Sequence, residues 1–394
     1  MRVSRRAESI EPFHVMQVAK EAHALAATLE PGQPRMIFLN IGEPDFTAPP
    51  LVQAAAAQAV ADGRTQYTAA MGIAPLRERL SAWYQSRFGV AVSPERIMIT
   101  AGASAGLQLA CMLTCDEGDE ILMPDPSYPC NRHILTAIGA RAVLLPTTAA
   151  SRYQLNAAQM AKTWGPRTRG VLLASPSNPT GTSVDPAELQ RILALVAERG
   201  GAALMDEIYL GLSHDERYAQ TALAYSEDVI SINSFSKYFN MTGWRLGWLV
   251  LPPALVPAAE RLQQNLFICA STVAQQAALA CFEPDSLAEY ERRRAAFKAR
   301  RDAFIPALRE LGLGIPVMPD GAFYAWADAS PWFERLGVSN STELVQLLLR
   351  RAHVVVTPST DFHQQDQGTH IRFSTASSME DLQEAAQRLK ALLG

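Results

Sequence analysis

The sequence predicts an α/β protein with a mostly parallel central sheet, helices on both faces of that sheet and a smaller α+β domain. Short apolar runs alternate with helical segments through most of the chain, and the texture of the sequence changes near residue 282. The length of 394 residues also exceeds what one hydrophobic core usually serves. We therefore expect one large domain and one smaller domain.

The N-terminal segment is expected to form an arm and one helix. Apolar residues recur at helical spacing over 14–30, and this stretch ends at a Pro-Gly stop signal. Residues 36–46 then form a brief apolar strand that runs into a Gly-Glu-Pro-Asp turn, and a helix is predicted over 51–61. We assign residues 1–47 to the smaller domain.

The middle of the chain alternates between strand-like runs and helices. The strand-like runs are 96–100, 120–123, 142–145, 170–174, 202–205, 229–233 and 247–251. Alternation of this kind is typical of strand–helix–strand units, which build a parallel sheet covered on both faces. We assign residues 48–283 to the large α/β domain.

The last part of the chain begins with a long, charge-rich amphipathic helix over 286–311. Shorter segments follow it: an apolar run at 321–328, a helix at 342–352, strand-like runs at 354–357 and 371–374, and a terminal helix. This order suggests a small α+β domain. We assign residues 284–394 to its C-terminal part.

Composition excludes several classes of protein. The chain has 35 Lys+Arg against 39 Asp+Glu, a near balance that argues against a nucleic-acid partner. Its five cysteines form no CxxC pair, which favours a reducing, cytoplasmic location and predicts no metal site. The longest charge-free stretch, 262–282, contains Gln and Asn, so we expect a soluble helix there and no membrane partner.

A run of small residues, Ala-Gly-Ala-Ser-Ala-Gly at 101–106, follows the strand 96–100 and opens a helix. Small residues at a strand-to-helix turn leave backbone N–H groups and a positive dipole end free, which suits a phosphate. The same residues could instead allow close packing of the helix on the sheet.

Lys237 follows the strand 229–233 in the segment Ser-Phe-Ser-Lys, and Arg245 comes eight residues later. Burial would lower the pKa of this lysine and free its amine to attack a carbonyl carbon. Ser234, Ser236 and Arg245 would then be donors for an anion close by. The alternative is a solvated lysine in a surface loop, as most lysines are.

Three further polar residues follow neighbouring strands. Asn178 comes after the strand 170–174, and Asp206 and Tyr209 come after the strand 202–205. All three should project from C-terminal strand ends, where open α/β sheets place their ligands.

In these motifs the chain resembles the fold-type I pyridoxal-phosphate (PLP) enzymes, and more narrowly the class I/II aminotransferases. The matching motifs are GEPDF at 42–46, YTAAMGIAPLR at 67–77, SPSNPTG at 175–181, DEIY at 206–209 and SFSK with GWRLG within 234–247. They occur in family order over nearly the whole chain. The resemblance implies a PLP-dependent aminotransferase that moves an amino group between an α-amino acid and a 2-oxo acid by a ping-pong mechanism through pyridoxamine phosphate.

The resemblance also implies which residues hold the cofactor ring. Lys237 would carry PLP as an internal Schiff base and later move a proton between substrate and cofactor. Asp206 would keep the pyridine nitrogen protonated. Tyr209 and Asn178 would hydrogen-bond the phenolic oxygen of the ring, and Tyr128 matches the aromatic residue that stacks on the ring face.

The remaining implied roles concern the phosphate and the substrate. The phosphate would be bound by the backbone amides of Ala103 and Ser104 and by the side chains of Ser234, Ser236 and Arg245. Arg372 matches the arginine that grips the substrate α-carboxylate, with help from Gly42 and Asn178. Tyr67 matches a tyrosine that reaches the phosphate of a neighbouring subunit, so the resemblance implies a homodimer with shared active sites.

The sequence leaves the substrate side chain and the reaction type open. Arg132 and His133 are candidates for binding an acidic side chain, whereas Phe13, Phe267 and Ile268 could line an apolar pocket. A PLP-dependent C–S β-lyase shares much of this pattern of motifs. A non-catalytic PLP-sensing module is a third hypothesis, which the sequence favours less than either enzyme.

Overall fold

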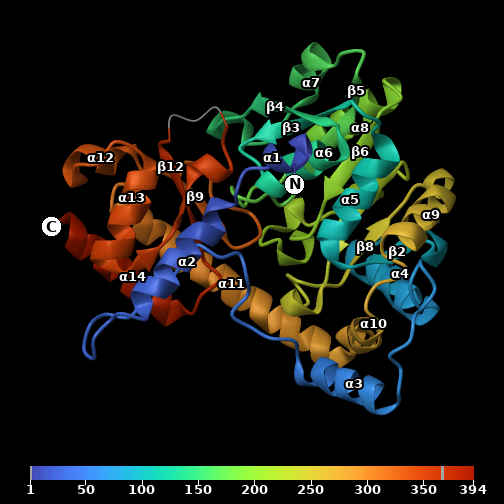
Figure 1. The fold of residues 1–394 in the computed structure, drawn as a ribbon, viewed down its shortest axis with the longest axis horizontal. Helices are drawn as coiled ribbons and strands as arrows, with labels where there is room; N and C mark the ends of the chain where they lie inside the picture. Colours follow the sequence, from blue (N-terminus) through green and yellow to red (C-terminus); the bar gives the residue numbers. More distant parts are fainter. Residues whose placement is uncertain (1, 365–367) are drawn as a thin grey trace.

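The computed structural model describes residues 2–364 and 368–394 (Figure 1). Within them, the large sheet has the strand order β2-β8-β7-β6-β5-β3-β4. Its strands are β2 (Ile97–Thr100), β3 (Glu120–Asp125), β4 (Arg141–Pro146), β5 (Thr168–Ala174), β6 (Ala202–Asp206), β7 (Val229–Ser234) and β8 (Gly247–Val250). Only β8 runs antiparallel to its neighbours, β2 and β7. The predicted mostly parallel sheet is confirmed.

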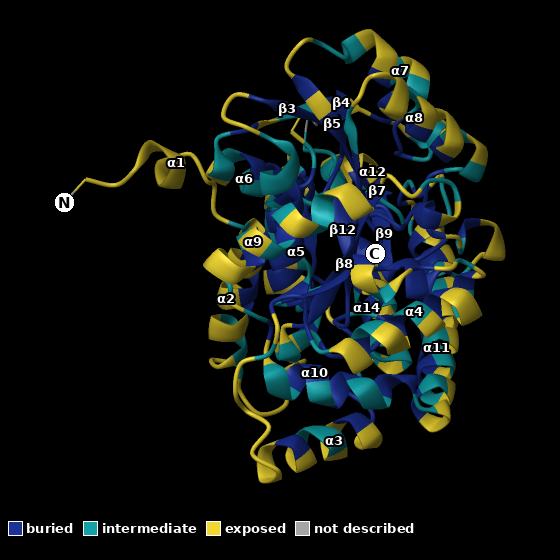
Figure 2. Cartoon of the chain, turned by 90° about the vertical axis from the view of Figure 1, so that its right-hand side faces the viewer, coloured by how far each residue is buried: buried dark blue, intermediate teal, exposed yellow. Residues whose placement is uncertain are grey.

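Helices cover both faces of this sheet, as predicted. Along β5, Val171 and Leu173 belong to one apolar cluster and Leu172 to another, because successive strand residues point to opposite faces. The helices of the large part are α3 (Pro50–Ala61), α4 (Ala74–Phe88), α5 (Gly102–Thr114), α6 (Pro129–Ile138), α7 (Ala157–Thr163), α8 (Pro186–Glu198), α9 (Val256–Leu266) and α10 (Thr272–Ala278). Figure 2 shows buried strands at the centre and exposed outer helix faces.

The two ends of the chain meet in a smaller α/β region. Its strands are β1 (Ile37–Phe38), β9 (Tyr324–Asp328), β10 (Val354–Val355), β11 (Thr357–Pro358) and β12 (His370–Ser374), and its helices are α2 (His14–Ala26), α12 (Ser330–Leu336), α13 (Ser341–Leu347) and α14 (Met379–Leu393). The short helix α1 (Arg5–Glu8) instead lies against α6 of the large part. β1 pairs in parallel with β10, while β9, β11 and β12 form an antiparallel sheet. This pairing joins the N-terminal segment to the C-terminal part.

The long helix α11 (Pro284–Glu310) connects the two regions (Figure 1). Near its start, Tyr290 and Phe297 pack into the apolar cluster of the large sheet. Near its end, Phe304 and Leu308 pack into the cluster of the smaller region. The helix therefore contributes apolar side chains to both regions. The predicted domain boundaries at residues 47/48 and 283/284 stay a prediction.

The single helix predicted over 262–282 is wrong. α9 ends at Leu266, and Ile268 has a left-handed backbone with φ 65°, which a continuing helix cannot contain. The Ser271 side chain then caps the new helix α10 by accepting a hydrogen bond from the Ala274 N–H. In the described part of the chain, no helix has both the length and the apolar character needed to cross a membrane.

Candidate active site

Four segments of the predicted site start from the same edge of the large sheet. Asp206 is the last residue of β6, Asn178 follows β5, Lys237 follows β7 and Gly102 begins α5 after β2. Because β8 is antiparallel to both β2 and β7, strands β2, β5, β6 and β7 all point the same way. Their carboxyl ends therefore meet at one edge, which is where α/β proteins bind ligands.

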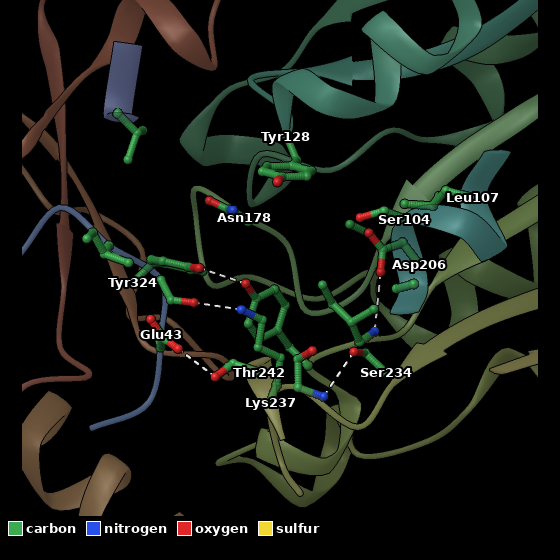
Figure 3. A pocket seen from close by; sticks show the side chains of 18 of the residues that line it. Glu43, Ser104, Leu107, Tyr128, Asn178, Asp206, Ser234, Lys237, Thr242 and Tyr324 are labelled. Atoms are coloured by element: carbon green, nitrogen blue, oxygen red, sulfur yellow. Dashed lines mark hydrogen bonds between the residues drawn. The ribbon is translucent and has the colours of Figure 1, made fainter. Parts of the chain in front are cut away.

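A cavity of about 410 Å³ opens at this edge (Figure 3). The predicted site residues that line it are Gly42, Ala103, Ser104, Tyr128, Asn178, Asp206, Tyr209, Ser234, Ser236, Lys237, Arg245 and Arg372. Tyr67 does not line it. Its side chain is 80% exposed on the connection between α3 and α4.

Lys237 points its amine into the cavity rather than into bulk solvent. Its Nζ donates a 2.6 Å hydrogen bond to the Gly42 carbonyl and lies 5.6 Å from the centre of the Tyr209 ring. Burial lowers the pKa of this amine to about 8, and the nearby Glu43 carboxylate partly opposes that effect. With such a pKa, about one lysine in ten is a neutral nucleophile at pH 7.

Asp206 is a carboxyl group suited to a cationic partner. Its side chain is 3% exposed, and its Oδ1 accepts a 3.3 Å hydrogen bond from the Ile208 N–H. Burial raises the pKa of this carboxyl to about 7, and the adjacent Glu207 adds to the increase. A cation such as a protonated pyridine nitrogen would stabilise the ionised form of Asp206.

Asp206→Asn should stabilise the cofactor-free protein in a pH-dependent way. Between about pH 4 and 7 the folded protein keeps a proton on Asp206 that the unfolded chain releases, so this group lowers the free energy of unfolding as pH rises. A pKa moved from 3.8 to about 7 corresponds to about 4 kcal/mol. Urea unfolding at several pH values should show the variant gaining nothing at pH 4 and about 4 kcal/mol at pH 7.

The matched control for this prediction is Asp302→Asn. Asp302 lies on the surface, and its contacts with Lys298 and Arg301 lower the pKa of its carboxyl despite some burial. Its replacement should give no stabilisation that grows with pH. A difference between Asp206→Asn and the parent protein that stayed constant from pH 4 to 7 would contradict the buried state of Asp206.

The first turn of α5 and Arg245 together form a place suited to an anion. No side chain caps the N-terminus of α5 among the residues described, and Gly102 there has a φ of 78°. A Cβ atom on Gly102 would lie 2.7 Å from Arg245 Nη2, and the positive φ is strained for other residues, so glycine suits this approach. Arg245 donates to the Thr242 carbonyl at 2.8 Å, and no described carboxylate lies within 4 Å of its guanidinium. Helix amides and a guanidinium together suit a phosphate.

Arg372 is a second group suited to an anion. This arginine is 2% exposed on β12, where its Nη1 donates to Asn178 Oδ1 at 2.8 Å and its Nη2 to the Asn40 carbonyl at 2.5 Å. Its guanidinium carbon lies 4.5 Å from the centre of the Tyr324 ring and 4.6 Å from that of Phe362. In the described chain, Nε has no hydrogen-bond partner and no carboxylate pairs with this guanidinium. A carboxylate ligand would supply the missing charge.

Sequence reasoning missed several residues that line the cavity, among them Tyr324 and Glu43. The Tyr324 hydroxyl lies 2.6 Å from that of Tyr209, and a Cβ on Gly42 would overlap it. Glu43 accepts a 2.5 Å hydrogen bond from the Thr242 hydroxyl (Figure 3). Glu43 lies within the GEPDF motif, which could have indicated it. Tyr324 lies in an apolar strand, and no motif or pattern around it indicates a site residue.

The structure separates the candidates for the substrate side-chain pocket. Phe13 lines the cavity, whereas Arg132, His133, Phe267 and Ile268 do not. The Arg132 guanidinium is buried and donates a 2.9 Å hydrogen bond to the backbone carbonyl of residue 361. Of the candidates named from sequence, only the apolar Phe13 is therefore in place to contact a substrate.

Comparison with known proteins identifies the family. The family model described as "Aminotransferase class I and II" matches residues 34–389. The chain is 37% identical to the valine–pyruvate aminotransferase of Mycobacterium tuberculosis, with 100% of this chain and 98% of that protein covered. It is 31% identical to aromatic-amino-acid aminotransferase 2 of Thermococcus litoralis, with 100% and 98% covered.

Solved structures show the same likeness. An aminotransferase from Mycobacterium tuberculosis superposes with a TM-score of 0.93 at 37% identity, covering 100% of this chain and 99% of that one. The aspartate aminotransferase from Thermus thermophilus with maleate gives a TM-score of 0.90 at 30% identity, with both chains fully covered. Aminotransferases of this family are generally PLP-dependent and have the fold-type I architecture. The chain therefore belongs to the class I and II aminotransferases.

Proposed function

We propose that this aminotransferase uses PLP, with Lys237 as the Schiff-base lysine. An α-amino acid would leave its amino group on the cofactor as pyridoxamine phosphate, and a 2-oxo acid would collect it in the second half of a ping-pong cycle. Bound PLP supplies an electron sink for the negative charge that develops at the substrate Cα.

One observation carries this proposal. Two guanidinium groups without a described carboxylate partner, Arg245 and Arg372, line the same cavity as a lysine of lowered pKa and a buried carboxyl of raised pKa. A ligand that satisfies all four groups carries a phosphate, a carboxylate, a carbonyl carbon and a basic ring nitrogen. PLP together with an α-amino acid or a 2-oxo acid provides this set.

Each side chain would then act on a defined atom. Arg245, the first amides of α5, Ser234 and Ser236 would bind the phosphate, and Asp206 would hold a proton on the ring nitrogen. Asn178 accepts from Arg372 through Oδ1, so its Nδ2 stays available as a donor to the ring oxygen.

The two remaining groups act on the ring oxygen and on the substrate proton. Burial raises the pKa of Tyr209 well above its usual value, so its hydroxyl keeps the proton that it would donate to the ring oxygen. Lys237 Nζ, once released, is the base that takes the proton from Cα.

A half-reaction experiment tests this proposal. The purified protein should be yellow, and a single addition of an amino acid without acceptor should shift its absorption to that of pyridoxamine phosphate and release one equivalent of 2-oxo acid. Adding a 2-oxo acid should restore the first spectrum. A PLP-dependent C–S β-lyase would instead release pyruvate repeatedly from cysteine derivatives without any acceptor, and that result would contradict transamination.

We propose further that the enzyme is a homodimer in which Tyr67 serves the phosphate of the partner subunit. Tyr67 is 80% exposed, and the apolar side chains of Leu51 and Val60 on α3 and of Ile268 are also exposed. The Thr272 hydroxyl donates a 2.5 Å hydrogen bond to the Gln66 carbonyl, which fixes the turn carrying Tyr67 beside the start of α10. A second copy would cover these apolar groups.

Mixed dimers test the shared site. Lys237→Ala lacks the amine, and Tyr67→Glu sets a carboxylate against the phosphate, which should cost on the order of kilocalories per mole in a partly dry site. Each parent should be inactive. In a hybrid dimer with shared sites, one site collects both changes and the other receives neither, so activity should return on co-expression. A confirmed hybrid that stays inactive would contradict the arrangement.

We also propose a cytoplasmic location. Among the described residues all five cysteines are free thiols, and Cys111 and Cys281 are buried. Unpaired thiols are typical of proteins in reducing compartments.

A further inference from the structure

We propose that the side chain of the preferred amino donor is apolar, aliphatic or aromatic, and that the enzyme discriminates against dicarboxylic amino acids. This inference rests on the proposed function and adds the substrate class. The structure supports it through an apolar wall at the start of α2, through the position of that wall beside Arg372, and through the charges that line the cavity.

The apolar wall comes from the N-terminal segment. Phe13, Val15 and Met16 line the cavity, and Ile41 joins them from the segment after β1. The Phe13 ring packs edge-on against the Tyr128 ring with centroids 6.1 Å apart. Since Tyr128 is also the residue proposed to stack on the cofactor ring, the wall begins next to the place where a substrate would react.

A chain of two hydrogen bonds connects this wall with the carboxylate site. The Asn40 side chain donates to the Val15 carbonyl at 3.4 Å, and the Asn40 carbonyl accepts from Arg372 Nη2 at 2.5 Å. Val15 also shares an apolar cluster with Phe362, whose ring lies 4.6 Å from the Arg372 guanidinium carbon. A substrate held by its α-carboxylate at Arg372 would thus have α2 within reach of its side chain.

The start of α2 is held firmly in this position. The Asp361 carboxylate accepts hydrogen bonds from the N–H groups of His14 at 3.0 Å and Val15 at 2.8 Å, which satisfies the first donors of the helix. Arg132 donates to the Asp361 carbonyl at 2.9 Å. Arg132 was considered from sequence as a cation for acidic substrates. It instead helps to hold Asp361, which in turn holds the start of α2.

The charges in the cavity disfavour an acidic side chain. In the described chain, the lysines and arginines that line the cavity are Lys237, Arg245 and Arg372, and the proposed function already assigns each of them. The other charged lining residues are the acids Glu43 and Asp206. Among the described residues of its own chain, a second carboxylate on the substrate would lose water against apolar side chains and find no further cation, which is unfavourable.

Half-reactions with a panel of donors test the substrate class on the complete holoenzyme. We expect kcat/KM for leucine, valine, methionine or phenylalanine to exceed that for aspartate and glutamate at least a hundredfold. A preference for aspartate or glutamate would overturn the inference while leaving the proposed function intact. If no amino acid of either kind shifted the cofactor spectrum, the proposed function itself would fail.

Removing part of the wall should affect donors according to their length. Phe13→Ala should lower kcat/KM for phenylalanine or leucine about tenfold and leave that for alanine nearly unchanged, because the alanine methyl is too short to reach α2. An equal loss for alanine and leucine would show a general structural defect rather than a lost contact, and would contradict the role of Phe13.

Adding a cation to the wall provides the converse test. Met16 is 61% exposed on α2 and lines the cavity, so Met16→Arg should fold normally and raise kcat/KM for aspartate at least tenfold relative to leucine. The matched control is Gln17→Arg, which adds the same charge at an exposed neighbour that does not line this cavity. The proposed position of the substrate side chain would be overturned if kcat/KM for aspartate relative to leucine rose in neither variant, or rose equally in both.

Discussion

Lys237→Ala is expected to lower kcat by at least about 10⁴-fold, because both the covalent attachment of the cofactor and the proton transfer at Cα depend on this amine. PLP should still bind, since the α5 amides, Ser234, Ser236 and Arg245 remain. Stopped-flow half-reactions with the variant would measure the loss. Small primary amines should restore part of the activity, and this rescue should increase with pH as the added amine loses its proton.

The control for this prediction is Lys298→Ala. Lys298 lies on the outer face of α11, where it pairs with Asp302 at 2.7 Å. It does not line the cavity. Its replacement should leave kcat unchanged. A Lys237→Ala protein that folds, binds PLP and keeps more than a few per cent of the parent kcat would contradict the role of this lysine.

Arg372→Lys is expected to lower kcat/KM for the amino donor by about three orders of magnitude, or about 4 kcal/mol. Lysine is a point charge on a flexible stem, so it cannot reproduce the planar fork that lies between Tyr324 and Phe362 and binds Asn178. The loss should appear mainly as a higher KM, since the groups around Lys237 are untouched. Steady-state kinetics over a wide range of donor concentration would separate the two parameters.

The same substitution at Arg96 serves as a control for a buried arginine. Arg96 is also largely buried, but its guanidinium donates to the carbonyls of Leu251 and Glu227, and it does not line the cavity. Arg96→Lys should affect stability and leave KM for the donor unchanged. An Arg372→Lys enzyme with the parent KM would place the substrate carboxylate elsewhere.

The edge of the sheet that carries the site could be predicted from sequence. Asn178, Asp206 and Lys237 each follow an apolar run, and in a parallel sheet the ends of such runs lie side by side whatever the exact pairing. The prediction of the candidate site therefore depended on one local pattern, a polar residue after an apolar run, which occurs three times. The roles of these residues stay proposals, because their placement alone tests no chemistry.

Contacts that depend on tertiary register could not be predicted in the same way. Tyr324 reaches the Tyr209 hydroxyl only because β9 pairs with β12, where Ser374 lies opposite Tyr324. Asn40 bridges Val15 and Arg372 across more than 300 residues of sequence. No local periodicity contains such information, since it arises from how separate elements pack.

The prediction of one helix over 262–282 was wrong for a different reason. The stretch 262–282 has no charged residue, no Gly and no Pro, so propensity favoured one helix. The chain breaks at Ile268, where a β-branched residue takes a left-handed conformation that propensity disfavours. Tertiary packing of α9 and α10 overrides the local preference there.

The most direct test of the central claim is to identify the lysine that carries the cofactor. Borohydride reduction of the holoenzyme fixes PLP to the amine that holds it, and peptide mapping by mass spectrometry then locates the label. We expect one pyridoxyl group per chain, on Lys237, with no label in Lys237→Ala. A label on any other lysine, or a protein that takes up no PLP, would contradict this claim.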